Sequence, residues 1–207
     1  MQIVYPSASL EFAMKEVDLM EKIELAGRTC YKSEGKITEN SCLGFVRMIL
    51  KNNHQSVLEH ASITARFVCD RGVSHELVRH RLASYSQESQ RYCNYGTGGN
   101  VVFVYPHWFD GGTMTEKDTW QETMEFCESQ YIRLLEQGFS PQDARAVLPN
   151  STKTEIVVTA NLREWIHILK LRTHQSAHPD MRLLMELFSN ELKKHYPNLM
   201  RIINEYF

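Results

Sequence analysis

Apolar side chains recur at helical spacing along much of the chain, so the fold must pack several amphipathic helices against a smaller number of other elements. Two of these helices have N-terminal signals of their own. Ser140 is a hydroxyl N-cap followed by Pro141 at the first helical position, and Asn161 with Glu164 resembles a capping box. We expect helices at residues 10–26, 41–51, 115–137, from 141 to before Pro149, from 161 to about 172, and from 179 to about 196.

Three segments favour strands instead. Residues 61–68 alternate small or apolar with polar side chains and are rich in β-branched residues, and 101–105 and 154–159 are further strand candidates. Helices and strands do not alternate strictly, so the pattern predicts an α/β protein of the α+β type, with a central, mainly antiparallel sheet flanked by helices.

The chain of 207 residues is long enough to bury a substantial core, and no linker or repeat divides it, so we expect one domain over residues 1–207. The glycine-rich stretch at 96–99 is expected to be a turn. The five cysteines are odd in number and form no C-x-x-C pair, which argues against a disulfide framework or a zinc ribbon. Without a signal peptide or an apolar span, a cytoplasmic protein with no membrane contact is predicted.

One window, residues 79–92, holds an unusual share of hydrogen-bond donors: three arginines, a histidine, three serines and two glutamines. Guanidinium groups match the geometry of phosphate and carboxylate, so the window predicts recognition of a phosphorylated or polyanionic small molecule. The alternative is a solvated helix face. Such a face usually mixes lysines with acids, whereas this window has no lysine and only Glu88.

Arg172 is the second candidate. It follows Trp165 by seven residues and Ile168 by four, which places it on the apolar side of the expected helix. An arginine there is costly unless it meets an anion or several acceptors. The alternatives are that its side chain extends past the helix end or pairs with Asp143 or Glu155.

Other signals are weaker. His174 and His178 have the i,i+4 spacing of a metal site but lack the glutamate of H-E-x-x-H, and Pro179 indicates a helix boundary, so no metal is predicted. A metal hydrolase using this pair is one competing reading. A non-enzymatic binder of RNA or of a nucleotide regulator is another, although the net charge of −2 gives no support for nucleic acid.

Arg79-His80-Arg81, then seven residues, Ser89 and Arg91, resembles the signature of the flavin-dependent thymidylate synthases. Further blocks that resemble the family follow in the same order: LAGRTCY at 25–31, HQSVLEH at 54–60, ARAVLP at 144–149, NLR at 161–163, and the segment 171–178. The resemblance implies an enzyme that methylates dUMP to dTMP, with 5,10-methylenetetrahydrofolate as carbon donor, tightly bound FAD and NADPH as reductant. It also implies a homotetramer with active sites shared between subunits.

Roles carried over by motif position fall into three groups. The resemblance implies FAD contacts by Ser56, Arg79, His80, Arg81, Gln87, Asn161, Leu162, Arg163 and His167. It implies dUMP contacts by Glu76, Arg79, Gln87, Glu88, Ser89, Gln90, Arg91, Arg145 and Arg172. Arg172 would be catalytic, polarising the uracil and favouring ionisation at N3 so that C5 becomes nucleophilic.

The resemblance also implies that no cysteine attacks the uracil, which agrees with the absence of an evidently activated cysteine; Cys93 is the nearest candidate. Three positions depart from common family residues. Glu76 stands where glutamine is common, Gln87 where glutamate is frequent, and His167 where asparagine is frequent.

Overall fold

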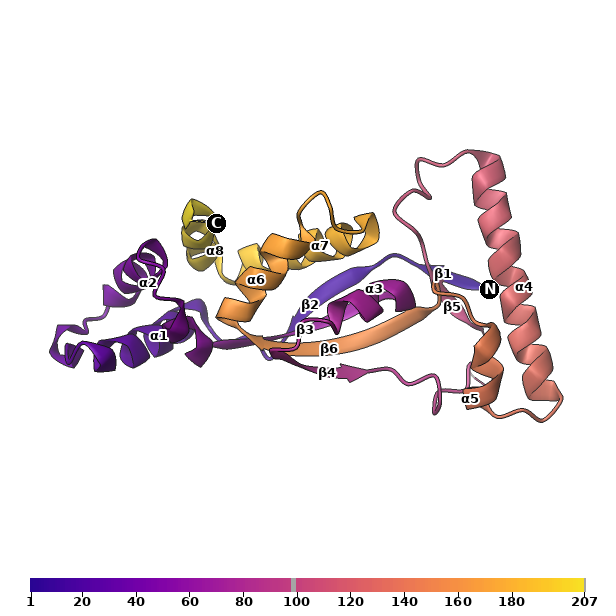
Figure 1. Cartoon of the computed structure of the whole chain (residues 1–207), viewed down its shortest axis with the longest axis horizontal. Coiled ribbons are helices and arrows are strands. Elements are labelled where there is room, and N and C mark those ends of the chain that lie inside the picture. Colours follow the sequence, from indigo (N-terminus) through magenta and orange to yellow (C-terminus); the bar gives the residue numbers. More distant parts are fainter. Residues whose placement is uncertain (98–99, 207) are drawn as a thin grey trace. The chain divides into compact units, whose positions relative to one another are not determined.

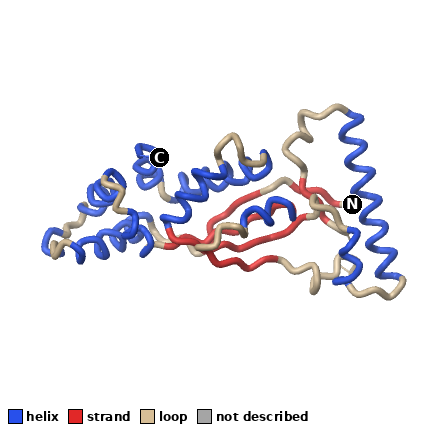
Figure 2. The backbone as a smooth tube through the Cα atoms, in the orientation of Figure 1, coloured by secondary structure: helices blue, strands red, loops and turns tan. Residues whose placement is uncertain are grey.

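The computed structural model describes residues 1–97 and 100–206 (Figures 1 and 2). Gly98 and Gly99, in the expected turn at 96–99, lie outside the described residues. The strands are β1 (Gln2–Val4), β2 (Ser7–Glu11), β3 (Ser62–Asp70), β4 (Ala83–Gln87), β5 (Val102–Val104) and β6 (Lys153–Asn161). The α-helices are α1 (Glu16–Cys30), α2 (Ser41–Lys51), α3 (Arg71–Leu77), α4 (Met114–Glu136), α5 (Pro141–Ala144), α6 (Leu162–Arg172), α7 (Pro179–His195) and α8 (Pro197–Tyr206). Short 3₁₀ helices lie at η1 (Glu34–Lys36), η2 (Gln55–His60) and η3 (Arg145–Val147).

The strands form a four-stranded sheet in the order β2-β3-β6-β4 and a separate parallel pair, β1 with β5. The larger sheet is mainly antiparallel and is flanked by helices, which confirms the predicted fold class. In β6 every second side chain is buried, and β3 follows the same alternation. Such a period of two directs one face of each strand to a core.

The chain divides into two compact units. The first unit comprises Met1–Ser7, Phe67–Arg79 and Ser86–Ile156, and the second comprises Ala8–Arg66, His80–Tyr85 and Val157–Phe207. The chain passes from one unit to the other within β2, β3, β4 and β6, and once more between Arg79 and His80. The single domain over residues 1–207 stays a prediction.

The second unit has a core built largely from helices. Trp165 is fully buried on α6, its ring centroid lies 4.5 Å from that of Phe188 on α7, and its indole N–H donates to the carbonyl of Ile63 at 2.9 Å. Because the one polar atom of the indole is satisfied, the whole ring can be buried without a desolvation penalty. Helix α6 is thereby held against both α7 and the start of β3.

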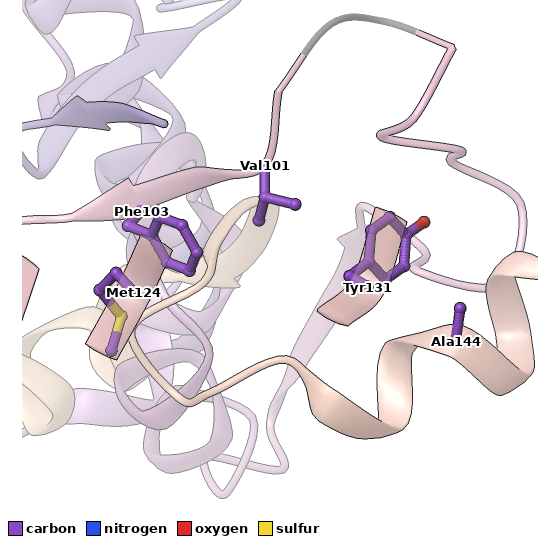
Figure 3. Packing of buried hydrophobic residues seen from close by; sticks show 5 residues of the cluster. All are labelled: Val101, Phe103, Met124, Tyr131 and Ala144. Atoms are coloured by element: carbon purple, nitrogen blue, oxygen red, sulfur yellow. The ribbon is translucent and has the colours of Figure 1, made fainter. Parts of the chain in front are cut away.

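The first unit has a smaller core, formed where α4 packs near the β1–β5 pair. Figure 3 shows five of its buried side chains: Val101, Phe103, Met124, Tyr131 and Ala144. A capping box at Thr113 and Glu116 begins α4, in which the hydroxyl and the carboxylate each bond the other residue's backbone N–H. Reciprocal caps of this kind satisfy orphan donors at the first turn.

Most of the expected helices and strands are present in the structure, and two of the helices differ from it. The helices at 41–51, 115–137, 161–172 and 179–196 are confirmed to within a residue or two, as are the three expected strands. The helix expected at 10–26 was placed too early, because Ser7–Glu11 is a strand and Phe12 has a φ of 51°, which no α-helix contains. The helix expected from Pro141 breaks after Ala144 into a 3₁₀ turn.

Five strands and α-helices were not expected from the sequence: β1, β2, β4, α3 and α8. Each of the first four is short, so hydrophobic periodicity has few residues on which to act. Among the described helices, none combines the length and apolar character needed to cross a membrane.

Helix α1 contains a glycine that the packing requires. A Cβ on Gly27 would lie 2.5 Å from the Phe45 ring of α2, whereas a Cβ on Gly44 would meet nothing within 4 Å. We expect Gly27→Ala to lower the free energy of unfolding by about 1–3 kcal/mol, the usual cost of overpacking. Gly44→Ala, the matched control in an exposed helix position, should raise it by roughly 0.5–1 kcal/mol through helix propensity. Urea unfolding followed by circular dichroism measures both, and equal stability of the two variants would refute the packing argument.

Candidate functional site

In the second unit, β6 continues directly into α6, and Asn161 sets the turn between them. Its side-chain oxygen accepts from the backbone N–H of Glu164 at 2.9 Å, as an N-cap does. With the start of the helix fixed, Trp165 and Ile168 are buried while Arg163 and His167 are exposed. Arg163, His167 and Lys170, spaced at i, i+4 and i+7, thus form an exposed polar stripe on α6.

Two pockets lie beside this stripe in the second unit. The larger, of about 500 Å³, is lined by Gln55, Glu59, Leu82, Asn161, Arg163, Glu164, Ile166, His167 and Lys170. The other, of about 400 Å³, is lined by Glu59, Ser62, Arg81, Leu82, Ala83, Ser84, Thr159, Ala160 and Asn161. Because Glu59, Leu82 and Asn161 line both, the pockets adjoin one another.

Four side chains with a predicted cofactor role line these pockets: Arg81, Asn161, Arg163 and His167. Arg163 forms an exposed ion pair with Glu59 of η2. Ion pairs this exposed are worth little, so an anionic ligand can compete for the guanidinium at small cost. Leu82, with 72% of its surface exposed, supplies an apolar wall to both pockets.

At its other end, α6 brings Arg172 to His80. The Nε–H of Arg172 donates to Nε2 of His80 at 2.9 Å, and His80 is only 6% exposed. Sequence reasoning named both residues but gave Arg172 other partners. The two lie 92 positions apart, so no local pattern could have joined them.

The surroundings of His80 keep its imidazole neutral. Burial, then the charge of Arg172 and then that of His167, lower the pKa of His80 from 6.5 to about 4. Its carbonyl accepts from the Tyr85 hydroxyl at 2.6 Å. Burial, and next the charge of Glu164, raise the pKa of Tyr85 to about 12, so this hydroxyl remains a donor.

The first unit contains a separate polar cluster around Gln87. The amide nitrogen of Gln87 donates to the hydroxyls of Ser74 at 2.9 Å and Thr154 at 3.1 Å. Arg71 approaches Thr154 Oγ1 and the carbonyl of Glu88 with its Nη1, both at 3.4 Å. The predicted ligand contact Gln87 therefore has its amide nitrogen engaged with the protein.

Glu88, a predicted dUMP contact, is held by two donors. Tyr95 donates its hydroxyl to one carboxylate oxygen at 2.8 Å, and Lys153 approaches the other at 3.1 Å. Burial, and next the hydrogen bond to Glu88, raise the pKa of Tyr95 well above its usual value. A carboxylate restrained in this way can position its neighbours in the segment 88–91.

Sequence reasoning did not find Arg71, Ser74, Thr154, Lys153 or Tyr95. A usable signal exists for one of them. Thr154 is buried within β6, and a buried hydroxyl in an otherwise apolar strand face requires a hydrogen-bond partner. Arg71 and Ser74 lie in α3, which the sequence did not predict, Tyr95 lies in a turn, and Lys153 begins β6 one residue before the expected strand.

The remaining predicted residues have simpler settings. Ser89 accepts from the backbone N–H of Arg91 at 3.3 Å, and the Nε–H of Arg145 donates to the carbonyl of Gln142 at 3.2 Å. Leu162 is buried with its N–H bonded to the carbonyl of Ala61. Arg79 and Ser56 are exposed, and Glu76 and Gln90 are partly buried. The structure assigns no ligand to any of them, so their roles stay predictions.

The histidine pair considered for a metal has other contacts. Nδ1 of His174 lies 2.8 Å from the Ser176 hydroxyl, and Nδ1 of His178 accepts from the backbone N–H of Asp180 as the N-cap of α7. Over residues 1–97 and 100–206, no three His, Cys, Asp or Glu side chains are grouped as ligands for a metal ion.

Comparison with known proteins decides the family. Residues 15–198 match the family model described as thymidylate synthase complementing protein. A flavin-dependent thymidylate synthase of Geobacter sulfurreducens is 38% identical over 189 residues, which cover 86% of this chain and 79% of that relative. The chain belongs to the flavin-dependent thymidylate synthase family.

Other comparisons agree with this membership. The flavin-dependent thymidylate synthase of Mycobacterium tuberculosis (strain ATCC 25618 / H37Rv) is 37% identical over 178 residues, covering 78% of this chain and 70% of the relative. A solved UMP/dUMP methylase of Streptomyces cacaoi bound with 5-Br dUMP superposes with a TM-score of 0.81 at 23% identity, covering 100% of this chain and 98% of the other. At that identity it establishes the fold alone. The predictions of the family and of an enzyme are confirmed.

The buried imidazole of this family member should make stability depend on pH. The unfolded chain binds a proton at His80 near pH 6.5, whereas the folded chain binds it only near 4, so stability is lost as the pH falls through this window. The full shift corresponds to roughly 3 kcal/mol. Urea unfolding at about pH 7.5 and pH 4.5 should show a larger loss for the wild type than for His80→Gln. Identical losses in the two proteins would show that His80 does not titrate in this way.

Proposed function

We propose that this chain is an FAD-dependent thymidylate synthase that methylates dUMP to dTMP. In this proposal 5,10-methylenetetrahydrofolate supplies the carbon, NADPH is the reductant, and no cysteine acts as nucleophile. Family membership supports the reaction. The observation that carries the proposal is that Arg81, Asn161, Arg163 and His167, four predicted cofactor contacts, line two adjoining pockets of the second unit.

The residues around these pockets fit FAD. Arg81 and Arg163 offer guanidinium groups for a pyrophosphate, and Leu82 offers an apolar wall for a ring. Asn161 uses its amide oxygen for the helix cap, so its amide nitrogen can still donate to a ligand. When bound, FAD would supply the redox chemistry, while the protein binds, orients and neutralises. The other proposed contacts are Ser56, Arg79, His80, Gln87 and Leu162.

For dUMP, we assign the nucleotide contacts to Glu76, Arg79, Gln87, Glu88, Ser89, Gln90, Arg91, Arg145 and Arg172. Arg172 has the catalytic role in this proposal. A fixed guanidinium beside the uracil favours ionisation at N3 and makes C5 more nucleophilic, because the charge that develops meets a preorganised cation. Its position at the end of α6, with Nε bonded to His80, supports that assignment.

Two of the five cysteines support a mechanism without a thiol nucleophile. Cys42 and Cys69 are buried, and burial raises the pKa of both, that of Cys69 to about 12. A thiol with such a pKa is almost entirely protonated at neutral pH and is a poor nucleophile. We further propose a cytoplasmic enzyme, one domain over residues 1–207, and a homotetramer whose active sites are shared between subunits, with FAD bound tightly.

The decisive test is an anaerobic visible spectrum of the purified, FAD-supplemented protein before and after NADPH, with and without dUMP. We expect a bound flavin band that NADPH bleaches and that dUMP perturbs, because one site holds all three. Addition of 5,10-methylenetetrahydrofolate should then yield dTMP, and NADH in place of NADPH tests the reductant. Absence of flavin binding would refute the proposal, and so would flavin reduction without dTMP.

Arg172→Ala separates cofactor binding from catalysis. We expect the variant to retain FAD and to lose dTMP formation by about 10²–10³-fold, the usual cost of removing one preorganised group that stabilises developing charge. Arg201→Ala, which removes an exposed guanidinium on α8, is the matched control and should behave as the wild type. Near-normal turnover by Arg172→Ala would contradict the catalytic role.

A further inference from the structure

The contact between Arg172 and His80 is made through Nε, the donor nearest the side-chain stem. Nε of Arg172 and Nε2 of His80 are 2.9 Å apart. A hydrogen bond at Nε occupies a single N–H of the guanidinium and fixes the direction in which its planar group points. An arginine at a helix end has several rotatable bonds, so such a restraint favours the rotamers that keep the contact.

The acceptor in this contact is itself restrained on several sides. The Tyr85 hydroxyl bonds the carbonyl of His80 at 2.6 Å, and the His167 ring lies edge-on with its centroid 6.0 Å away. Nδ1 of His80 faces Glu164 Oε1 at 3.8 Å, and both side chains are less than a tenth exposed. Tyr85 of β4 thus restrains the backbone of His80, while residues of α6 surround its ring.

The donor also fixes the tautomer of the imidazole. Since a guanidinium only donates, Nε2 of His80 must be unprotonated, and its proton must lie on Nδ1, toward Glu164. A buried carboxylate at that distance favours this tautomer through its charge. The arrangement runs from carboxylate to imidazole to guanidinium.

We propose that His80 is a positioning residue for Arg172: its Nε2 lone pair aims the guanidinium at the uracil of dUMP, and Glu164 holds the tautomer that makes this possible. The inference rests on the proposed function and gives His80 a task beyond an FAD contact. The low pKa of His80 means that the arrangement persists throughout the neutral range.

Two substitutions at His80 separate an acceptor from a packing role. His80→Phe keeps a ring but has no acceptor, whereas His80→Gln offers an amide oxygen near the place of Nε2. We expect His80→Phe to lower kcat for dTMP formation by about 10–100-fold, the scale of a misdirected catalytic group. His80→Gln should recover most of that loss. Because His80 is also a proposed FAD contact, kcat is measured at saturating FAD, and His195→Phe, an exposed histidine at the end of α7, is the control.

A double-mutant cycle tests whether His80 acts through Arg172. Lysine has no guanidinium Nε–H, so in an Arg172→Lys background the substitution His80→Phe should cost less than about threefold in dUMP affinity and in turnover. Additive losses would overturn the inference. So would wild-type kcat in His80→Phe, or a loss of activity that saturating FAD restores.

Two further outcomes are distinguishable. If the wild type forms no dTMP, the proposed function fails, and the positioning role fails with it. If His80→Phe does not fold, Glu164→Gln, which keeps size but removes the charge, decides the question. That variant should lower kcat several-fold while retaining FAD, and should shift the acid limb of the kcat–pH profile; an unchanged kcat and profile would overturn the inference.

Discussion

The strand-to-helix turn at Asn161 is the constraint on which the candidate site depends. β6 buries every second side chain up to this residue, and the Asn161 oxygen then takes the Glu164 N–H and starts α6 at a fixed position. The start of a helix sets the direction of each later side chain. Trp165 therefore enters the core, His167 faces a pocket, and Arg172 reaches His80. Asp70 makes a similar cap in the first unit, where its carboxylate accepts from the backbone N–H of Val73 at the start of α3.

Buried charge in both units is matched with donors. Glu24 accepts from Arg28 and from Ser41, and Glu128 accepts from the backbone N–H of Val101 at 2.9 Å. An unpaired carboxylate in these positions would cost several kcal/mol, so such contacts are obligatory. His80, in contrast, is buried in its neutral form, because a second cation beside Arg172 would be unfavourable. The free-energy cost of burying an uncompensated charge thus accounts both for the paired carboxylates and for the lowered pKa of His80.

Sequence patterns predicted the elements whose signals are long or explicit. The apolar stripe of α2 and the long pattern of α4 extend over enough residues for periodicity to be clear, and Asn161 with Glu164 marks the start of α6. The polar strand β4 was missed because its residues, Ala83–Gln87, looked like part of an anion-binding cluster rather than a strand. The window 79–92 was recognised by its chemistry, but its division between two units depends on long-range packing. The bond from Arg172 to His80 joins residues 92 positions apart, so only the folded chain reveals it.

Two effects act on Arg172, and they differ in kind. As one of two basic residues in the last turn of α6, it lies at the negative end of the helix dipole, which stabilises a cation by about 0.3–1 kcal/mol. The dipole, however, acts on the charge and is nearly indifferent to the direction of the guanidinium plane. The Nε contact with His80 supplies direction but adds no charge. A cation that must contact one ring of a substrate needs a stabilised charge and a fixed direction. Helix α6 alone stabilises the charge of Arg172 but does not orient its guanidinium. The contact with His80 provides that orientation.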